Sequence, residues 1–413
     1  MVQSLLSRQI TPSLQKALKN TPVVCLLGPR RVGKTTLARM FEPSRAYISF
    51  DDTTLLNAAR QDPTGFVRGL PDQVTLDEVQ RVPELMPAIK LAAERQAKAG
   101  RFLLTGSAGP QLLPGVQESL DGLVEVLNVY AFTEKEKQSG NKSLLERLLA
   151  GDINPGVTGD QTAIEGVAEA LCQGGYPESN TRTPARAGQW HRQYLKSIMQ
   201  RDVKDIATVR DEGDLSRLMG MLACRTARLL NVSSFAAELG MRRETTEKYL
   251  SVLERLFLIR RLPAWHTNQT NRLVKTPKVH VMDSGLAASL SGLKAEQWHD
   301  HNTNFAPLLK SFAVQQLICE ASWVDRGLRF SHYRDKDQVE VDLVIERGPH
   351  VWGVEVKKAA SIHARDGAGL SRLAAQSGSD FKGGMVLYCG SNTLPLSPAR
   401  CLAVPMNELW QRD

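Results

Sequence analysis

The 413-residue sequence predicts a multidomain α/β protein whose first domain is built on a parallel sheet. Its length exceeds that of one compact core, so two or three domains are expected. Short apolar runs alternate with helical patterns between residues 20 and 135, which is typical of a parallel sheet with crossover helices. A mainly helical stretch over 161–265 follows, and strand-like apolar runs return near residue 279. We therefore expect a parallel-sheet domain, a helical middle region and a C-terminal α/β domain.

Bulk composition indicates a globular protein without a membrane segment. Hydrophobic residues make up 42% of the chain and charged residues 23%, the proportions of an ordinary soluble domain. The sequence lacks an apolar stretch long enough to span a bilayer, and the first residues lack the long apolar core of a signal peptide. Six scattered cysteines without a CxxC pair favour a reducing, cytoplasmic location. A net charge of +8 permits a polyanionic partner without requiring one.

Residues 28–35, GPRRVGKT, match the pattern G-x(4)-G-K-[ST] that binds nucleoside triphosphates. The apolar run PVVCLL precedes this loop and the helical pattern TTLARMF follows it, as the motif requires. Glycines let the backbone curl so that its N–H groups and the helix N-terminus face the phosphates. We expect Lys34 to neutralise phosphate oxygens and the Thr35 hydroxyl to complete a Mg²⁺ shell. The loop residues predicted to bind nucleotide are Gly28, Pro29, Arg30, Arg31, Val32, Gly33, Lys34, Thr35 and Thr36.

Two further strand ends carry polar residues that suit the same site. The run QVTLDEVQ ends an apolar-leaning strand in Asp77 and Glu78. Asp77 is placed to hold Mg²⁺, and Glu78 to polarise the attacking water; two surface acids after a buried strand would leave the glycine loop unexplained. The run RFLLTGS places Thr105 and Ser107 at another strand end, beside the expected γ-phosphate. A plain turn after a buried strand accounts for that spacing equally well.

Residues 229–265 have the layout of a winged helix-turn-helix. One predicted helix (Ser234–Leu239) ends at Gly240, a second runs over Glu244–Leu256, and the strand-like LIRRLPAW forms the wing. Residues 225–275 contain ten Lys or Arg residues and four Glu residues, so this segment is basic. The side chains expected to reach DNA are Arg242, Arg243, Thr245, Thr246 and Lys248. A solvated basic helix face and a protein-docking module are the alternatives.

The C-terminal region contains Asp342, then twelve residues, then Glu355-Val-Lys357. Alternating apolar residues in VEVDLVIE and VWGVEVKK predict adjacent strands, so Glu355 and Lys357 point the same way and Asp342 can join them. Two carboxylates bind Mg²⁺, while a lysine steadies the nucleophilic water or the phosphate charge. This is the D…E-x-K arrangement of restriction-like nucleases, a short and degenerate pattern. A fold retained only for docking is the alternative.

Five segments together resemble a widespread family of bacterial and archaeal AAA+-type ATPases: GPRRVGKTT, LDEVQRVP, LLTGSAGPQLL, CQGGYPE and RQYLKSIMQRDV. Members of that family carry a C-terminal domain of unknown function related to restriction endonucleases, and the resemblance covers nearly the whole chain. It implies an ATPase that uses ATP and Mg²⁺, with Glu78 as the base and Thr105 and Ser107 as sensors. The implied domains are a P-loop ATPase (1–135), a helical lid or connector (136–224), a winged helix (225–275) and a restriction-endonuclease-like domain (276–413).

The chain departs from this family at two places. Leu120-Asp121-Gly122-Leu123 stands where the family often has LAGR, so Leu123 cannot act as a trans-acting arginine finger. Arg201 is the remaining cationic candidate, unless it pairs with Asp202 or Asp205 on a helix surface. Lys310 stands where the family commonly has a glutamate, which adds a cation beside the predicted metal ligands; Glu320 follows later in that helix. We expect Asp283 to cap a helix rather than bind a ligand.

These observations support one leading hypothesis and two alternatives. The first is an ATPase that couples ATP binding or hydrolysis to the binding or remodelling of duplex or branched DNA. The second is an ATP-dependent metal nuclease for defence or repair, centred on Asp342, Glu355 and Lys357. The third is a nucleotide switch that docks a protein partner. A homo-oligomer is compatible with each of them.

Overall fold

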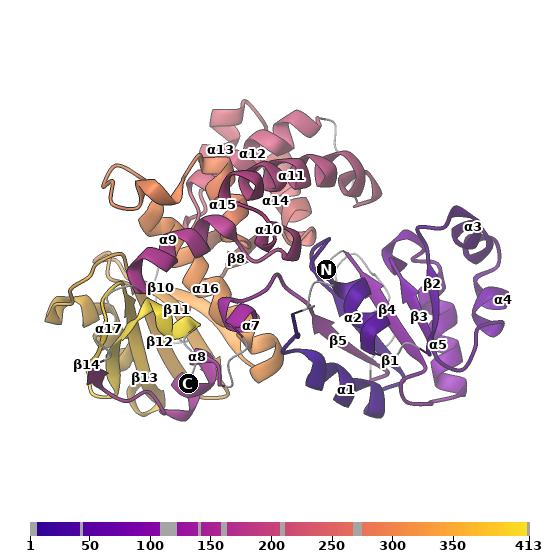
Figure 1. Cartoon of the computed structure of the whole chain (residues 1–413), viewed down its shortest axis with the longest axis horizontal. Coiled ribbons are helices and arrows are strands. Elements are labelled where there is room, and N and C mark those ends of the chain that lie inside the picture. The colour runs from indigo at the N-terminus through magenta and orange to yellow at the C-terminus, as the bar shows by residue number, and fades with distance from the viewer. Residues whose placement is uncertain are drawn as a thin grey trace. The chain divides into compact units, whose positions relative to one another are not determined.

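The computed structural model describes residues 6–41, 44–107, 122–138, 142–157, 163–206, 211–266 and 275–410 (Figure 1). Leu120 and Asp121 of the LDGL segment lie outside these ranges, as do residues 267–274 after the predicted wing strand. The chain divides into two compact units. Unit 1 contains Met1–Ala131, Arg201–Val209 and Ser251–Leu258, and unit 2 contains the other residues.

Unit 1 is built on a five-stranded sheet with the strand order β2-β3-β4-β1-β5. Every neighbouring pair in this sheet is parallel, which confirms the fold predicted from the alternating apolar runs. Its elements are α1 (Thr11–Asn20), β1 (Val23–Leu27), α2 (Lys34–Phe41), β2 (Ala46–Ser49), α3 (Thr53–Gln61), α4 (Pro63–Arg68), β3 (Val74–Asp77), α5 (Leu85–Arg95), β4 (Phe102–Gly106) and β5 (Val124–Asn128).

The loop between β1 and α2 begins at a point where only glycine fits. The β1 strand lies between β4 and β5, and all five of its residues are buried. Gly28 follows β1 and lies so close to the residue after β5 that a Cβ at this position would lie 1.9 Å from the carbonyl oxygen of Val129. The backbone therefore turns tightly as it leaves the sheet and enters the loop that precedes α2.

The first part of unit 2 is mainly helical. Its elements are α7 (Glu134–Gln138), α8 (Leu144–Ala150), β6 (Gly156–Val157), α9 (Ala163–Gln173), α10 (Pro177–Asn180), α11 (Pro184–Ile206), α12 (Glu212–Cys224), β7 (Arg228–Leu229), α13 (Val232–Leu239), α14 (Arg243–Arg255), β8 (Ile259–Leu262), β9 (Lys278–Val281) and α15 (Ser284–Ser291). The last residues of α11 and α14 belong to unit 1. Strands β7, β9 and β8 form a three-stranded antiparallel sheet in that order.

Capping residues define the helices of this region, and the sequence predicts two of them, Gly240 and Asp283, but not Asn231. The Asn231 side chain accepts a hydrogen bond from the amide of Ser234 at the start of α13, and Gly240 ends that helix at φ 66°. Asp283 caps α15 by accepting from the amide of Leu286 at 2.8 Å, which confirms its expected role. The other carboxylate oxygen of Asp283 accepts from the amide of Gly175 at 2.8 Å, so this residue also fixes the GGYP turn.

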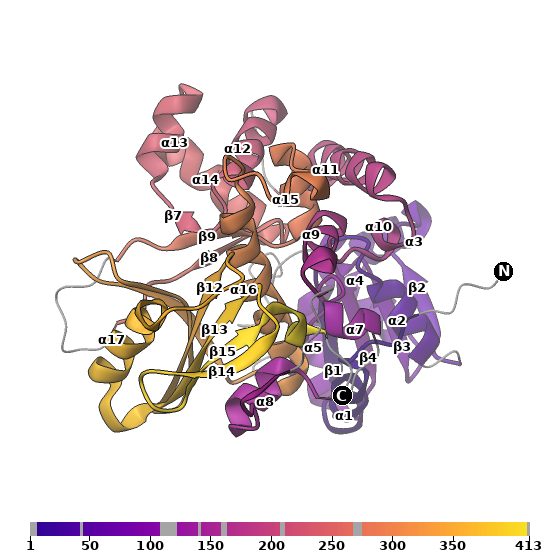
Figure 2. The same ribbon diagram turned by 60° about the vertical axis from the view of Figure 1, so that its left-hand side comes forward.

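The second part of unit 2 is a mixed sheet with the order β10-β11-β12-β13-β15-β14-β6. Helices α16 and α17 both pack on β12 (Figure 2). Leu370 and Leu373 of α17 fill the space above Gly353, where any Cβ would lie 2.6 Å from a Leu370 methyl group. The remaining elements are α16 (Phe305–Val324), β10 (Arg329–Arg334), β11 (Glu340–Arg347), β12 (His350–Lys357), α17 (Ala368–Ser377), β13 (Phe381–Tyr388), β14 (Asn392–Leu396) and β15 (Cys401–Pro405).

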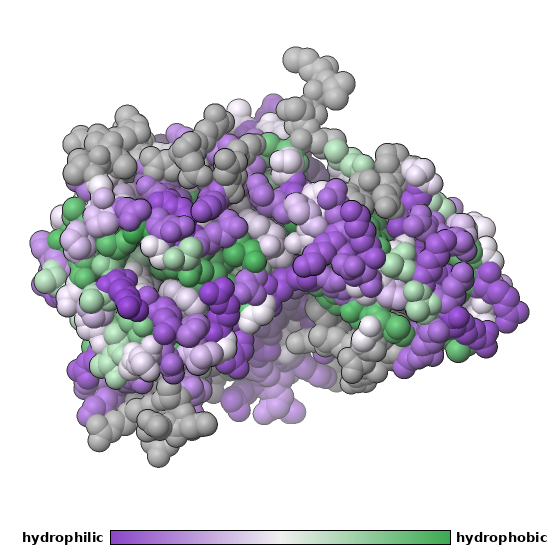
Figure 3. All heavy atoms as spheres, turned by 90° about the horizontal axis from the view of Figure 1, so that it is seen from below, coloured by the Kyte–Doolittle hydropathy of each residue, from purple (hydrophilic) through white to green (hydrophobic). Residues whose placement is uncertain are grey.

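The exposed surface is predominantly polar on the side shown in Figure 3, where hydrophilic residues surround smaller apolar patches. Across the described ranges, no helix is both long enough and apolar enough to cross a membrane.

Candidate nucleotide site and C-terminal charged cluster

The phosphate-binding loop is curled by two residues in the left-handed region, Arg31 at φ 63° and Gly33 at φ 97°. Lys34 opens α2, and its ammonium group donates to the carbonyl oxygens of Gly28 at 2.9 Å and Pro29 at 2.8 Å. Burial lowers the pKa of Lys34 to about 8, although the Glu78 and Asp77 carboxylates oppose this shift. The lysine side chain therefore folds back onto the loop. Val32 is buried, while Arg31 and Thr36 are exposed.

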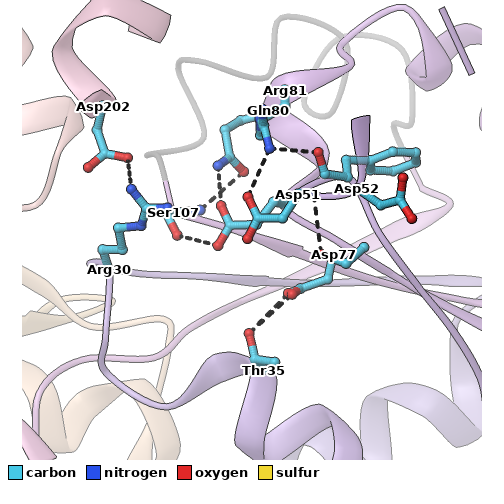
Figure 4. Close-up of polar contacts among 12 residues, drawn as sticks. Arg30, Thr35, Asp51, Asp52, Asp77, Gln80, Arg81, Ser107 and Asp202 are labelled. Carbon is cyan, nitrogen blue, oxygen red and sulfur yellow. Dashed lines mark hydrogen bonds and ion pairs between the residues drawn. The ribbon is translucent and has the colours of Figure 1, made fainter. Parts of the chain in front are cut away.

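The carboxylate of Asp77, at the end of β3, accepts hydrogen bonds from three hydroxyl groups. Thr35 Oγ1 lies 3.2 Å from both carboxylate oxygens of Asp77, as Figure 4 shows. The hydroxyls of Tyr47 and Thr105 also donate to this carboxylate. Burial and the Asp77 carboxylate raise the pKa of Tyr47, so its hydroxyl remains a donor. Sequence reasoning missed Tyr47 because no motif marks it; only its place on β2, beside β3, brings it to the site.

Thr35 and Asp77 fit a magnesium ion. Mg²⁺ prefers oxygen ligands and is usually held by one or two protein oxygens together with substrate phosphates. The Thr35 hydroxyl and the Asp77 carboxylate supply such oxygens side by side, next to the loop expected to hold the phosphates. A bound Mg²⁺ would neutralise charge on the β- and γ-phosphate oxygens.

Glu78 directly follows β3 and has a left-handed backbone at φ 61°. Ser107 Oγ donates to its Oε1 at 3.1 Å, and the Gln80 side-chain amide donates to its Oε2. Gln80 in turn accepts from the amide of Ser107 at 3.2 Å. Thr105 and Ser107 thus contact the two acids directly, Thr105 at Asp77 and Ser107 at Glu78. Their role as γ-phosphate sensors stays a prediction. Gln80 is a second residue that no sequence pattern marked.

Arg30 of the loop pairs with Asp202 at 2.7 Å (Figure 4). Asp202 lies at the end of α11, next to Arg201, whose side chain is exposed. Asp202, one of the two acids expected as a partner of Arg201, thus pairs with Arg30 of the loop. The side chain of Asp205 lies outside the described residues, and a catalytic role for Arg201 stays a prediction. Leu123 precedes β5, where its carbonyl accepts from the amide of Val23 at 3.2 Å.

The predicted nuclease residues lie on the neighbouring strands β11 and β12 of the mixed sheet in unit 2. Glu355 and Lys357 come together on β12 with Nζ and Oε2 3.7 Å apart, as the alternation predicted. Asp342 on β11 is held differently: its Oδ1 contacts Lys310 at 2.9 Å and Lys278 at 3.2 Å, and its Oδ2 accepts from the amide of Val356 at 3.0 Å.

Ammonium groups neutralise the acids of these two strands. Lys310 and Lys278 also contact Glu340, at 2.9 Å and 3.2 Å. Burial would raise the pKa of Asp342, but Lys310 and Lys278 outweigh it and hold the pKa well below its usual range. Burial raises the pKa of Glu355 to about 7, against the effect of Lys357. Among the described residues, no group of three or more His, Cys, Asp or Glu side chains is placed to hold a metal. Asp342 is thus already paired with two lysines, and Lys310 bridges it to Glu340 rather than to Glu355. The assignment of Asp342 and Glu355 as metal ligands stays a prediction.

The residues expected to contact DNA surround the start of α14. Arg242, Arg243 and Lys248 are exposed and Thr245 is half-buried. Thr246 is a correction: its side chain is fully buried and its hydroxyl donates to the carbonyl of Arg242 at 3.2 Å, so it is not available at the surface.

Comparisons with known proteins agree with the assignment of the nucleotide site. Residues 20–137 match a family model described as an AAA domain. Residues 164–297 and 306–409 match two models described as domains of unknown function, DUF8612 and DUF4143. Residues 20–137 thus have the fold of an AAA-type P-loop domain, and the sheet and loop described above are those of that domain.

Similar proteins of known sequence or structure were also found. Uncharacterized proteins of Mycobacterium tuberculosis and Mycobacterium bovis are each 28% identical to this chain over 406 residues, which span 97% of this chain and 84% of theirs. Among solved structures, a Walker-type ATPase of Pyrococcus abyssi is 16% identical with a TM-score of 0.41, over 70% of this chain and 97% of that one. A RuvB variant of Thermotoga maritima is 19% identical with a TM-score of 0.30, over 62% and 89%.

Proposed function

We propose that this protein is a Mg²⁺-dependent ATPase whose nucleotide state governs the binding or remodelling of DNA. One observation carries the ATPase: the Thr35 hydroxyl lies 3.2 Å from the Asp77 carboxylate, beside a loop that holds Lys34 and next to Glu78. This is the set of groups that phosphoryl transfer to water requires, namely a phosphate cradle, a magnesium shell and a base.

Each residue of the site has a distinct task in this mechanism. Lys34 leaves the carbonyls of Gly28 and Pro29 and contacts phosphate oxygens, which restores a full charge to its amine. Thr35 and Asp77 would hold a Mg²⁺ ion through their oxygens. Glu78 accepts a hydrogen bond from the attacking water and then its proton. Because Ser107 and Gln80 already donate to Glu78, they orient its carboxylate and must leave one lone pair open to the water.

The proposed binding of DNA is supported by the helices α12, α13 and α14. The chain order α12, β7, α13, α14, β8, β9 supports a winged-helix assignment, with β9 lying beyond the predicted bounds of 225–275. Arg242, Arg243 and Lys248 are exposed at and after the start of α14, where a recognition helix contacts phosphates and a groove.

ATP hydrolysis measured with and without DNA tests this function. We expect Lys34→Ala and Glu78→Gln to abolish turnover, with Glu78→Gln still binding nucleotide, and duplex or branched DNA to change the wild-type rate. Lys98→Ala is the matched control, since Lys98 is an exposed lysine of unit 1 paired with Asp72 at 2.9 Å. Full activity in Lys34→Ala would refute the ATPase assignment. A rate indifferent to all DNA forms, with ATP-dependent capture of a protein, would replace DNA by a protein partner.

A further inference from the structure

An open cavity of about 360 Å³ lies in unit 2 where β11 begins and β12 ends. Four cationic side chains line it, Lys310, Arg334, Lys357 and Arg365, together with the carboxylates of Glu340 and Glu355. These side chains come from α16, β10, β11, β12 and the turn before α17. The charge of the cavity depends on how many of the cations are already neutralised.

The carboxylates are neutralised from inside the protein. Lys278, whose side chain is only 2% exposed, contacts both Glu340 and Asp342 at 3.2 Å. Lys310 contacts the same two acids at 2.9 Å. Arg334 adds a third cation to Glu340 at 3.3 Å. A divalent metal bound by Glu340 and Asp342 would have to displace two ammonium groups, which makes these two acids poor metal ligands.

Two cations at the mouth remain available for a ligand. Lys357 contacts the Glu355 and Asp366 carboxylates only at 3.7 and 3.9 Å, longer than a hydrogen bond. Arg365 is exposed and, within the described residues, has no hydrogen-bond or ion-pair partner.

We propose that this cavity binds a phosphate group of a polynucleotide directly, through Lys357 and Arg365, with the Lys310 ammonium in place of a metal ion. A planar guanidinium and a flexible ammonium together match the oxygens of a phosphate, the guanidinium in a bidentate manner. The site holds the backbone without cutting it. This inference rests on the proposed DNA role, and a free phosphate ion shares its chemistry.

Binding of a fluorescein-labelled single strand, followed by anisotropy in EDTA without nucleotide, tests the proposal. The full-length background carries Arg242→Ala, Arg243→Ala and Lys248→Ala, which removes the exposed basic side chains predicted to contact DNA at and after the start of α14. In that background we expect Lys357→Ala with Arg365→Ala to weaken binding roughly tenfold and to lower the salt dependence by about two ion equivalents. Arg372→Ala is the matched control: Arg372 is an exposed arginine of α17 whose partner is Asp337 at 3.5 Å. It should leave the affinity unchanged.

Several results would overturn the proposal. Equal affinities of the cavity variant and the control would do so, and would leave the ATPase and the α14 contacts standing. Loss of binding in EDTA, restored by Mg²⁺, would mean that a metal and not Lys310 mediates the contact. Calorimetry with inorganic phosphate is the second arm: phosphate uptake lost in the cavity variant, with strand binding intact, would assign the cavity to a free anion. Strand binding that depends on the cavity, with an ATPase rate indifferent to DNA, would instead support the cavity and refute the proposed coupling.

Discussion

The ammonium nitrogen of Lys310 lies 2.9 Å from Oδ1 of Asp342 and equally close to Oε1 of Glu340. A side-chain cation thus bridges two acids, one of which is 3% exposed. Burial would lower the pKa of Lys310, but the two carboxylates outweigh it and raise the pKa above its ordinary value. This arrangement holds α16 against the edge of the mixed sheet and gives the first prediction.

Removing the Lys310 charge should destabilise the protein. We expect Lys310→Met to lower the free energy of unfolding by about 3 kcal/mol, because it leaves two acids with less compensation. The double variant Lys310→Met/Asp342→Asn should lose less free energy of unfolding, because it removes the buried Asp342 charge together with the lysine that neutralises it. Urea denaturation measures both. Lys336→Met, at an exposed lysine of the same domain, is the control; a similar loss there would mean that the ion pair is not the cause.

Glu320 should make stability fall as pH rises. This fully buried carboxyl accepts from the amide of Leu145 at 3.0 Å, and burial raises its pKa to about 8. The folded pKa lies above the unfolded one, so the contribution is complete below the unfolded pKa and is lost between that value and about pH 8. The expected slope is about 1.4 kcal/mol per pH unit. Glu320→Gln should flatten the urea-midpoint profile over this window. Glu94→Gln, at an exposed acid, should leave the slope as it is.

Nucleotide affinity should fall in alkaline solution. Lys34 has a pKa of about 8 in the folded chain, and phosphate binding requires its protonated form. Above that pH, each binding event must take up a proton, so the affinity should drop by up to about tenfold per pH unit. Titration of a fluorescent ATP analogue at increasing pH measures this. An affinity that stays constant up to the pH at which free lysines titrate would mean that Lys34 does not carry the contact.

Gly28 should tolerate no side chain. A Cβ there would lie 1.9 Å from the Val129 carbonyl oxygen, a backbone atom that cannot rotate away. Gly28→Ala is therefore expected to displace the loop and to abolish ATP binding in the same titration. Gly220→Ala is the control, because a Cβ at that position on α12 meets no atom within 4 Å. That variant should bind ATP normally and unfold at a slightly higher temperature, since alanine is the better helix former. Normal ATP binding by Gly28→Ala would contradict the close approach.

The nucleotide site was largely predictable, and the reason is local. The loop, its strand and its helix are contiguous in sequence, so one motif predicts their geometry; Asp77 and Glu78 follow because strand ends of a parallel sheet share an edge. Tyr47 and Gln80 were not predictable, because their contacts depend on strand order and on one rotamer. Thr246 was assigned to the surface because the face of α14 was inferred without knowing how its first turn is closed. Lys278 was missed altogether: it lies 64 residues from Asp342 in the chain and meets it only in the folded domain.

The left-handed backbone of Glu78 sets main-chain strain against the proposed catalytic role of its side chain. A branched or long side chain in this region costs on the order of 1 kcal/mol or more, whereas glycine adopts it freely. Replacement by glycine would relax the main chain while deleting the proton acceptor of the proposed mechanism. Main-chain stability and the proposed proton transfer therefore place opposite demands on this one position.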